Sequence, residues 1–160
     1  MKTKIAVLIL ASLTFASAAE KIKAPNGGRI IAAVEPHAEF LVTKDKKIEL
    51  RFLDDAGKVI TPAAQTASVV MGDRAAPTKL AFTLDGDKLV SDKAVAAGDN
   101  LPVVLTLKTT PEAKAIITKF NLNMSSCPEC KLIEYACICD HAKKEADHGH
   151  DHKPGEKHDH

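Results

Sequence analysis

The residues best suited to chemistry in this chain are gathered at its C-terminal end. All four cysteines and six of the seven histidines of the 160-residue sequence lie between Cys127 and His160. Thiolates and imidazoles are the side chains with which proteins hold zinc and related transition metals. The distribution therefore predicts a metal-binding end on an otherwise ordinary chain.

The cysteines follow the spacing C-x2-C-x6-C-x-C, and a histidine stands two residues after the last of them. Four soft ligands within thirteen residues can converge on one tetrahedral ion such as Zn²⁺. Pro128 helps to fix the first turn, and the segment from Lys131 to Ala136 bridges the two pairs, where we expect one helical turn. We predict a single, structural metal site with these ligands and one substitute ligand: Cys127, Cys130, Cys137 and Cys139, with His141 as the substitute.

Two other uses of the cysteines stay open at this stage. Export to an oxidising compartment would favour disulfides, and the bridges Cys127–Cys137 and Cys130–Cys139 would staple the C-terminal loop. A redox-active pair is the third alternative. Thiol oxidoreductases, however, carry Cys-x-x-Cys at a helix start in a βαβ setting, whereas here the pair follows a run of strand patterns.

A second candidate metal-binding segment, rich in histidine, follows the cysteines in residues 142–160. No apolar residue there is larger than alanine, so we expect no packed core and a disordered tail. Flexible imidazoles suit Zn²⁺, Ni²⁺, Cu²⁺ or Co²⁺, with modest and exchangeable affinity that protonation near pH 6.5 (roughly the free-histidine pKa) would abolish. The predicted tail ligands are His148, His150, His152, His158 and His160.

The first residues form an export signal. A basic start with Lys2 and Lys4 precedes an apolar run from Ile5 to Phe15 and a small-residue cleavage site. We predict cleavage after Ala18 or Ala19, which leaves a mature chain with a formal charge of −1 and no membrane anchor. The expected location is the periplasm or the exterior of the cell, and residues 19–27 would form a short lead-in.

The body between the two ends has the sequence pattern of β-strands. Runs with period-two alternation are separated by turn signals, as in residues 47–53, where Ile48, Leu50 and Phe52 share one face. Asp85-Gly86 is a hairpin signal between two such runs. The runs are 29–34, 37–43, 47–53, 58–60, 66–71, 79–84, 88–91, 102–108 and 116–124.

These runs predict an all-β fold of about eight short strands with turns every 8–12 residues or so. We expect an immunoglobulin-like two-sheet sandwich over residues 28–124, followed by a Cys-rich knuckle over residues 125–141. The body has no cysteine, so apolar burial must stabilise it. The expected aromatic core consists of Phe40, Phe52, Phe82 and Phe120.

Composition and motifs argue against two other classes of protein. A formal charge of +1 does not fit a dedicated nucleic-acid binder. The body holds a single histidine, His37, and lacks a Gly-x-Ser-x-Gly elbow, a phosphate loop and a Rossmann glycine pattern. We therefore expect no catalytic residue and no enzyme activity.

Three short motifs cover the first third of the body: Pro25-Asn26-Gly27-Gly28, His37-Ala38-Glu39-Phe40-Leu41-Val42 and Leu53-Asp54-Asp55-Ala56-Gly57-Lys58-Val59. They resemble the opening of a small periplasmic β-domain that occurs alone and at the N-terminal side of heavy-metal efflux adaptor subunits. Asn26 stands where that family commonly has histidine, so a metal-binding role of that histidine would be lost here. The resemblance implies an exported β-domain in a metal-handling context.

The sequence as a whole predicts an exported, soluble protein that binds or buffers transition-metal ions. Its partners would be the ions themselves and an envelope or metal-efflux protein. The alternative is a structural or interaction module of the cell envelope whose cysteines serve only as disulfide staples.

Overall fold

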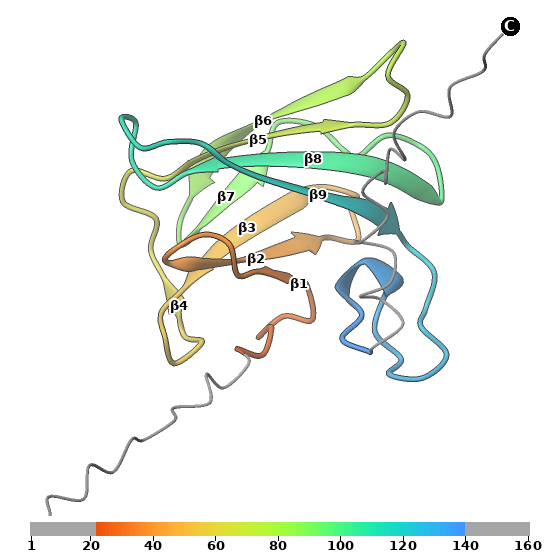
Figure 1. Ribbon diagram of the computed structural model, residues 1–160, viewed down its shortest axis with the longest axis horizontal. Coiled ribbons are helices and arrows are strands. Elements are labelled where there is room, and N and C mark those ends of the chain that lie inside the picture. The colour runs from red at the N-terminus through yellow and green to blue at the C-terminus, as the bar shows by residue number, and fades with distance from the viewer. Residues whose placement is uncertain (1–21, 140–160) are drawn as a thin grey trace, which may run out of the picture.

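The computed structural model describes residues 22–139, which form an all-β body followed by a short Cys-rich segment (Figure 1). The predicted export signal, His141 and the histidine-rich tail lie outside these residues. No helix in the described part of the chain is long and apolar enough to cross a membrane. The elements are β1 (Arg29–Ile31), β2 (His37–Val42), β3 (Ile48–Leu53), β4 (Val59–Ile60), β5 (Thr66–Met71), β6 (Thr78–Asp85), β7 (Lys88–Ser91), β8 (Asn100–Lys108), β9 (Ile116–Asn123) and the 3-10 helix η1 (Glu134–Ala136).

The strands form one continuous antiparallel sheet in the order β1-β2-β3-β7-β6-β5-β8-β9, with β4 paired to β3. Strand β6 joins the two halves of the sheet. Its first part, Thr78 to Ala81, pairs with β5, and its second part, Phe82 to Asp85, pairs with β7. The sheet curls until its two edge strands, β1 and β9, come to the same side of the molecule (Figure 1). The prediction of an all-β fold is confirmed.

The hydrophobic core lies between the two halves of the curled sheet. Ile48, Leu50 and Phe52 are fully buried, as the alternation in this segment predicts. Of the expected aromatic core, Phe40 and Phe52 are fully buried, whereas Phe82 and Phe120 are partly buried and pack against the edge of the core.

The hairpin between β6 and β7 differs by one residue from the sequence prediction. Asp85 is the last residue of β6 and pairs with Lys88, so the two turn residues are Gly86 and Asp87. Gly86 has φ +61°, while Asp85 needs no left-handed conformation. The predicted hairpin between these two runs is confirmed, with its turn one residue later in the chain, because a glycine at the first turn position suffices for a two-residue hairpin.

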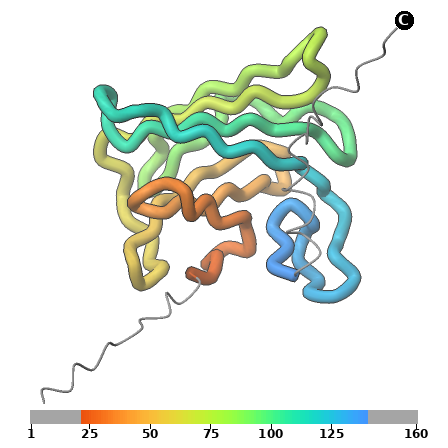
Figure 2. Tube along the Cα trace, viewed as in Figure 1, coloured from red at the N-terminus to blue at the C-terminus, as the bar shows by residue number. Residues whose placement is uncertain are grey.

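The Cys-rich segment folds back against the body after β9, beneath the end of that strand (Figure 2). The described part of the predicted knuckle is residues 125–139, and the name refers to this range from here on. Its helix η1 packs against both β9 and β1, and thus fills the gap between the two sheet edges. Tyr135 and Ala136 belong to the same buried cluster as the core of the body.

Candidate metal centre

The first cysteine pair is held by a small hairpin. Ser126 and Ile133 form an antiparallel bridge, and inside it the N–H of Cys127 donates to the carbonyl of Leu132 at 2.7 Å. The N–H of Lys131 donates back to the carbonyl of Cys127 at 3.1 Å, which closes the turn that carries Cys130. Lys131 has φ +63°, a left-handed conformation that reverses the chain directly after this cysteine.

The second pair follows a single helical turn, as the sequence predicts for the segment between the pairs. The N–H of Glu134 donates to the carbonyl of Ser125 at 2.8 Å, which fixes η1 beside the start of the knuckle. The N–H of Cys137 donates to the carbonyl of Glu134 at 3.0 Å and ends the turn. These bonds return the chain to the first pair, so cysteines ten residues apart meet.

The four sulfur atoms of Cys127, Cys130, Cys137 and Cys139 all lie within 4.8 Å of one another. The Sγ of Cys137 lies 3.5 Å from that of Cys127 and 3.6 Å from that of Cys130. A tetrahedral ion with Zn–S bonds of about 2.3 Å would separate its sulfur ligands by about 3.8 Å. No disulfide joins any two of these four cysteines. This cluster is thus compatible with one metal ion.

The cluster has a buried side and an open side. Cys127 is fully buried and Cys137 is 9% exposed, whereas Cys130 and Cys139 are partly exposed. Loss of hydration raises the pKa of both Cys137 and Cys139 above that of a free thiol. A hydrogen bond from the backbone of Leu132 lowers the pKa of Cys130 to about 7. Without a metal, Cys130 is therefore more readily ionised than Cys137 and Cys139, and a metal ion would displace the protons from those two.

The structure assigns a role to Tyr135, which the sequence prediction left as part of a bridging segment. This residue stands between the two cysteine pairs in the sequence, and its side chain is only 2% exposed and packed in the core of the body. The available signal was composition: it is the single tyrosine of the chain, and the chain has no tryptophan.

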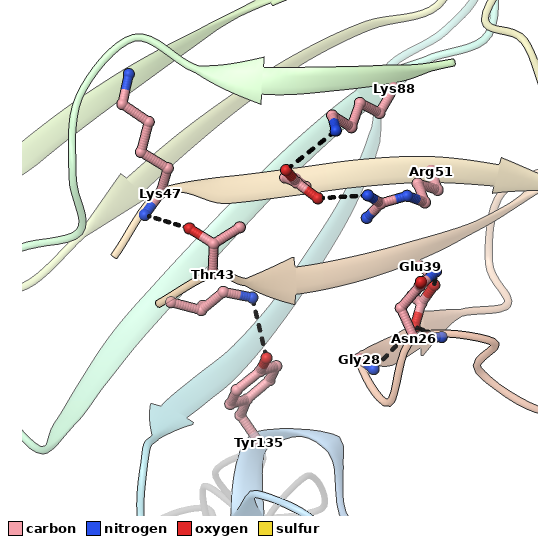
Figure 3. Close-up of polar contacts among 10 residues, drawn as sticks. Asn26, Gly28, Glu39, Thr43, Lys47, Arg51, Lys88 and Tyr135 are labelled. Atoms are coloured by element: carbon pink, nitrogen blue, oxygen red, sulfur yellow. Dashed lines mark hydrogen bonds and ion pairs between the residues drawn. The ribbon is translucent and has the colours of Figure 1, made fainter. Parts of the chain in front are cut away.

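The body does not form a second metal site from His37 and Glu39. His37 Nδ1 donates to the carbonyl of Val34 at 2.8 Å and lies 3.3 Å from the carboxylate of Glu35. Glu39 is fully buried and accepts hydrogen bonds from Asn26 and Gly28 (Figure 3). Among the described residues, the four cysteines are the one group of three or more His, Cys, Asp or Glu side chains that could hold a metal ion. The remaining predicted ligands, His141, His148, His150, His152, His158 and His160, lie outside this part of the chain.

Comparison with known proteins gave no relative. No family model matches the chain, and no match was found among curated proteins or solved structures. The assignment of a metal centre therefore depends on the geometry of the cysteines alone.

Proposed function

We propose that this protein is an exported, non-enzymatic metal-binding protein whose knuckle holds one Zn²⁺ ion through Cys127, Cys130, Cys137 and Cys139. The observation that carries the proposal is the convergence of four cysteine sulfur atoms, not joined by disulfides, within 4.8 Å of one another. Four thiolate ligands in a compact tetrahedral arrangement suit zinc, which has no geometric preference of its own. The expected site charge is close to −2, and the amine of Lys131 lies on the same turn.

The open side of the cluster suggests how the ion would be exchanged. Cys130 and Cys139 are partly exposed, and the histidine-rich segment begins directly after Cys139. We propose that residues 142–160 collect Zn²⁺, Ni²⁺, Cu²⁺ or Co²⁺ with modest affinity and pass ions to or from the knuckle. An envelope or metal-efflux protein is the proposed partner. For the body we propose an immunoglobulin-like arrangement in which the two halves of the continuous sheet pack face to face.

The test is a count of thiols and metal on the freshly isolated, signal-cleaved chain. One sample is alkylated, denatured and weighed, and a parallel native sample is analysed for metal. We expect four blocked thiols and one tightly bound zinc per chain. Two intact disulfides and no metal would overturn the proposal in favour of a stapled interaction module.

A deletion distinguishes metal binding by the four cysteines from metal binding by the histidine-rich tail. Removal of residues 142–160 should abolish the weak, multiple-site part of a calorimetric zinc or nickel titration and leave one tight site. An unchanged titration would contradict the role of the tail, whereas the loss of the tight site would contradict its assignment to the cysteines.

A further inference from the structure

Tyr135 inserts into the body at the gap between the two sheet edges. Its ring packs edge-on against Phe40 of β2, with centroids 6.0 Å apart, and Phe40 in turn packs edge-on against Phe120 of β9 at 5.1 Å. The guanidinium of Arg29 in β1 donates to the carbonyl of Tyr135 at 3.1 Å and lies 4.9 Å from the centre of the Phe120 ring. Through its ring and its carbonyl, Tyr135 thereby contacts β2 and β1 directly, and both partners contact Phe120 of β9.

The hydroxyl of Tyr135 also completes the edge of β2. Strand β1 begins at Arg29, opposite Phe40, so no strand residue lies beside Val42 on that edge. The N–H of Val42 donates instead to the Tyr135 hydroxyl at 3.0 Å, in a buried position (Figure 3). Because an unpaired buried N–H is costly, departure of Tyr135 would destabilise the end of β2.

The same tyrosine is tied to the cysteines. It is the central residue of η1, whose last hydrogen bond comes from the N–H of Cys137 and whose first residue is bonded to Ser125, two residues before Cys127. Helix η1 is thus joined by backbone hydrogen bonds to Cys137 of the second cysteine pair and to Ser125 beside the first, and its central residue is buried in the core of the body. The position of Tyr135 and the arrangement of the four sulfur atoms are therefore linked through η1.

We propose that metal binding at the knuckle and insertion of Tyr135 between β1, β2 and β9 are thermodynamically coupled. Bound metal would stabilise the inserted position of Tyr135, and the inserted tyrosine would hold the cysteines in the arrangement that binds metal. This inference rests on the proposed function. Such coupling is reciprocal. The factor by which insertion of Tyr135 raises the zinc affinity equals the factor by which bound zinc raises the equilibrium constant for insertion. The metal-free protein would open more readily at this end, where Phe40, Phe120 and the Val42 N–H become accessible.

The experiment measures the thermal unfolding of the full signal-cleaved chain by far-ultraviolet circular dichroism, with and without Zn²⁺. Free zinc at 100 times its Kd should raise the folded-to-unfolded ratio about 100-fold, and Tm by about 5–10 °C, if the site forms only in the folded body. A knuckle that bound zinc equally well in the unfolded chain would give no change in Tm. Replacement of all four cysteines by serine should remove the zinc-dependent gain even though the histidine tail is intact.

Two single variants separate coupling from general stability. Tyr135→Phe removes the hydroxyl that accepts from Val42, and Ser91→Ala removes a buried hydroxyl that accepts from Ile48, the cross-strand neighbour of Val42, at 3.0 Å. Both should lower the metal-free Tm. Only Tyr135→Phe should weaken zinc affinity, by about fivefold or more in competition with a chelator, and reduce the zinc-dependent gain in Tm.

A measurement on the unmodified chain supplements the variants. With one tyrosine and no tryptophan, the tyrosine fluorescence comes from Tyr135 alone. Zinc should reduce its quenching by acrylamide.

Equal zinc affinities in Tyr135→Phe and Ser91→Ala, together with an unchanged Tm on zinc addition, would overturn the coupling while the proposed function stands. A wild-type chain that binds no more zinc than the serine variant would overturn both.

Discussion

At the scale of single residues, the nearly buried Cys137 offers a direct test of the ligand assignment. Its Sγ lies 3.5 and 3.6 Å from two other sulfur atoms, and the side chain is 9% exposed. We predict that Cys137→Ser lowers zinc affinity by at least about 100-fold, because even outer-shell changes at metal sites cost 10- to 100-fold. Chelator competition measures this, and an affinity within tenfold of wild type would contradict the ligand assignment.

The ionisation of Cys130 predicts how zinc binding depends on pH. The Leu132 backbone hydrogen bond lowers the pKa of this thiol to about 7, so it is mostly protonated at pH 6 and mostly ionised at pH 8. Metal binding requires the thiolate, so binding at pH 6 should release about one more proton from this residue than at pH 8, and affinity should fall more steeply below pH 7.

Calorimetric titration in buffers of different ionisation enthalpy counts the protons released. Cys130→Ser is the control, because it removes this step and leaves the contribution of the histidines. The same pH dependence in wild type and control would contradict the assignment to Cys130.

Glu39 illustrates a buried carboxyl group with a structural role. It accepts hydrogen bonds from the N–H and side-chain amide of Asn26, at 2.9 and 2.8 Å, and from the N–H of Gly28 at 2.8 Å. We predict that Glu39→Ala lowers the free energy of unfolding by about 3 kcal/mol, because it leaves two backbone donors without their acceptor. Urea unfolding measures the loss. Zinc stoichiometry should stay the same, and a loss of bound zinc would show that this residue also serves the metal site.

At the scale of elements, the turn after Cys130 requires a left-handed residue. Lys131 has φ +63°, and its amine donates to the carbonyl of Pro128 at 2.7 Å. Replacement by glycine removes the amine but suits this conformation, whereas replacement by valine removes the amine and makes the conformation costly. We predict that Lys131→Val lowers zinc affinity about tenfold or more relative to Lys131→Gly, since backbone strain of this kind costs 1–3 kcal/mol. Equal affinities would mean that the turn does not set the position of the sulfur atoms.

Local patterns predicted the elements better than their connections. Alternation in residues 47–53 identified β3 and its buried face because side chains of a strand alternate between core and solvent. The division of β6 between two neighbours was not visible, because strand pairing depends on distant segments. The same limit applies to Glu39, whose partners lie in the N-terminal loop.

At the scale of the whole molecule, the candidate centre combines a predictable part with an unpredictable one. The four cysteines and the single turn between them followed from residue type and spacing. The anchoring of that turn by Tyr135 did not, because it needs the two sheet edges to meet on one side of the fold. The knuckle is therefore packed into the body, and metal binding there should raise the free energy of unfolding of the complete chain.

The central claim is that the four cysteines share one metal ion. Zinc-edge X-ray absorption on the signal-cleaved chain loaded with one equivalent of Zn²⁺ tests it most directly. We predict four sulfur neighbours at about 2.3 Å. A shell of nitrogen and oxygen at about 2.0–2.1 Å without sulfur would contradict the account, because it would place the ion on histidines or carboxylates and leave the knuckle without a metal.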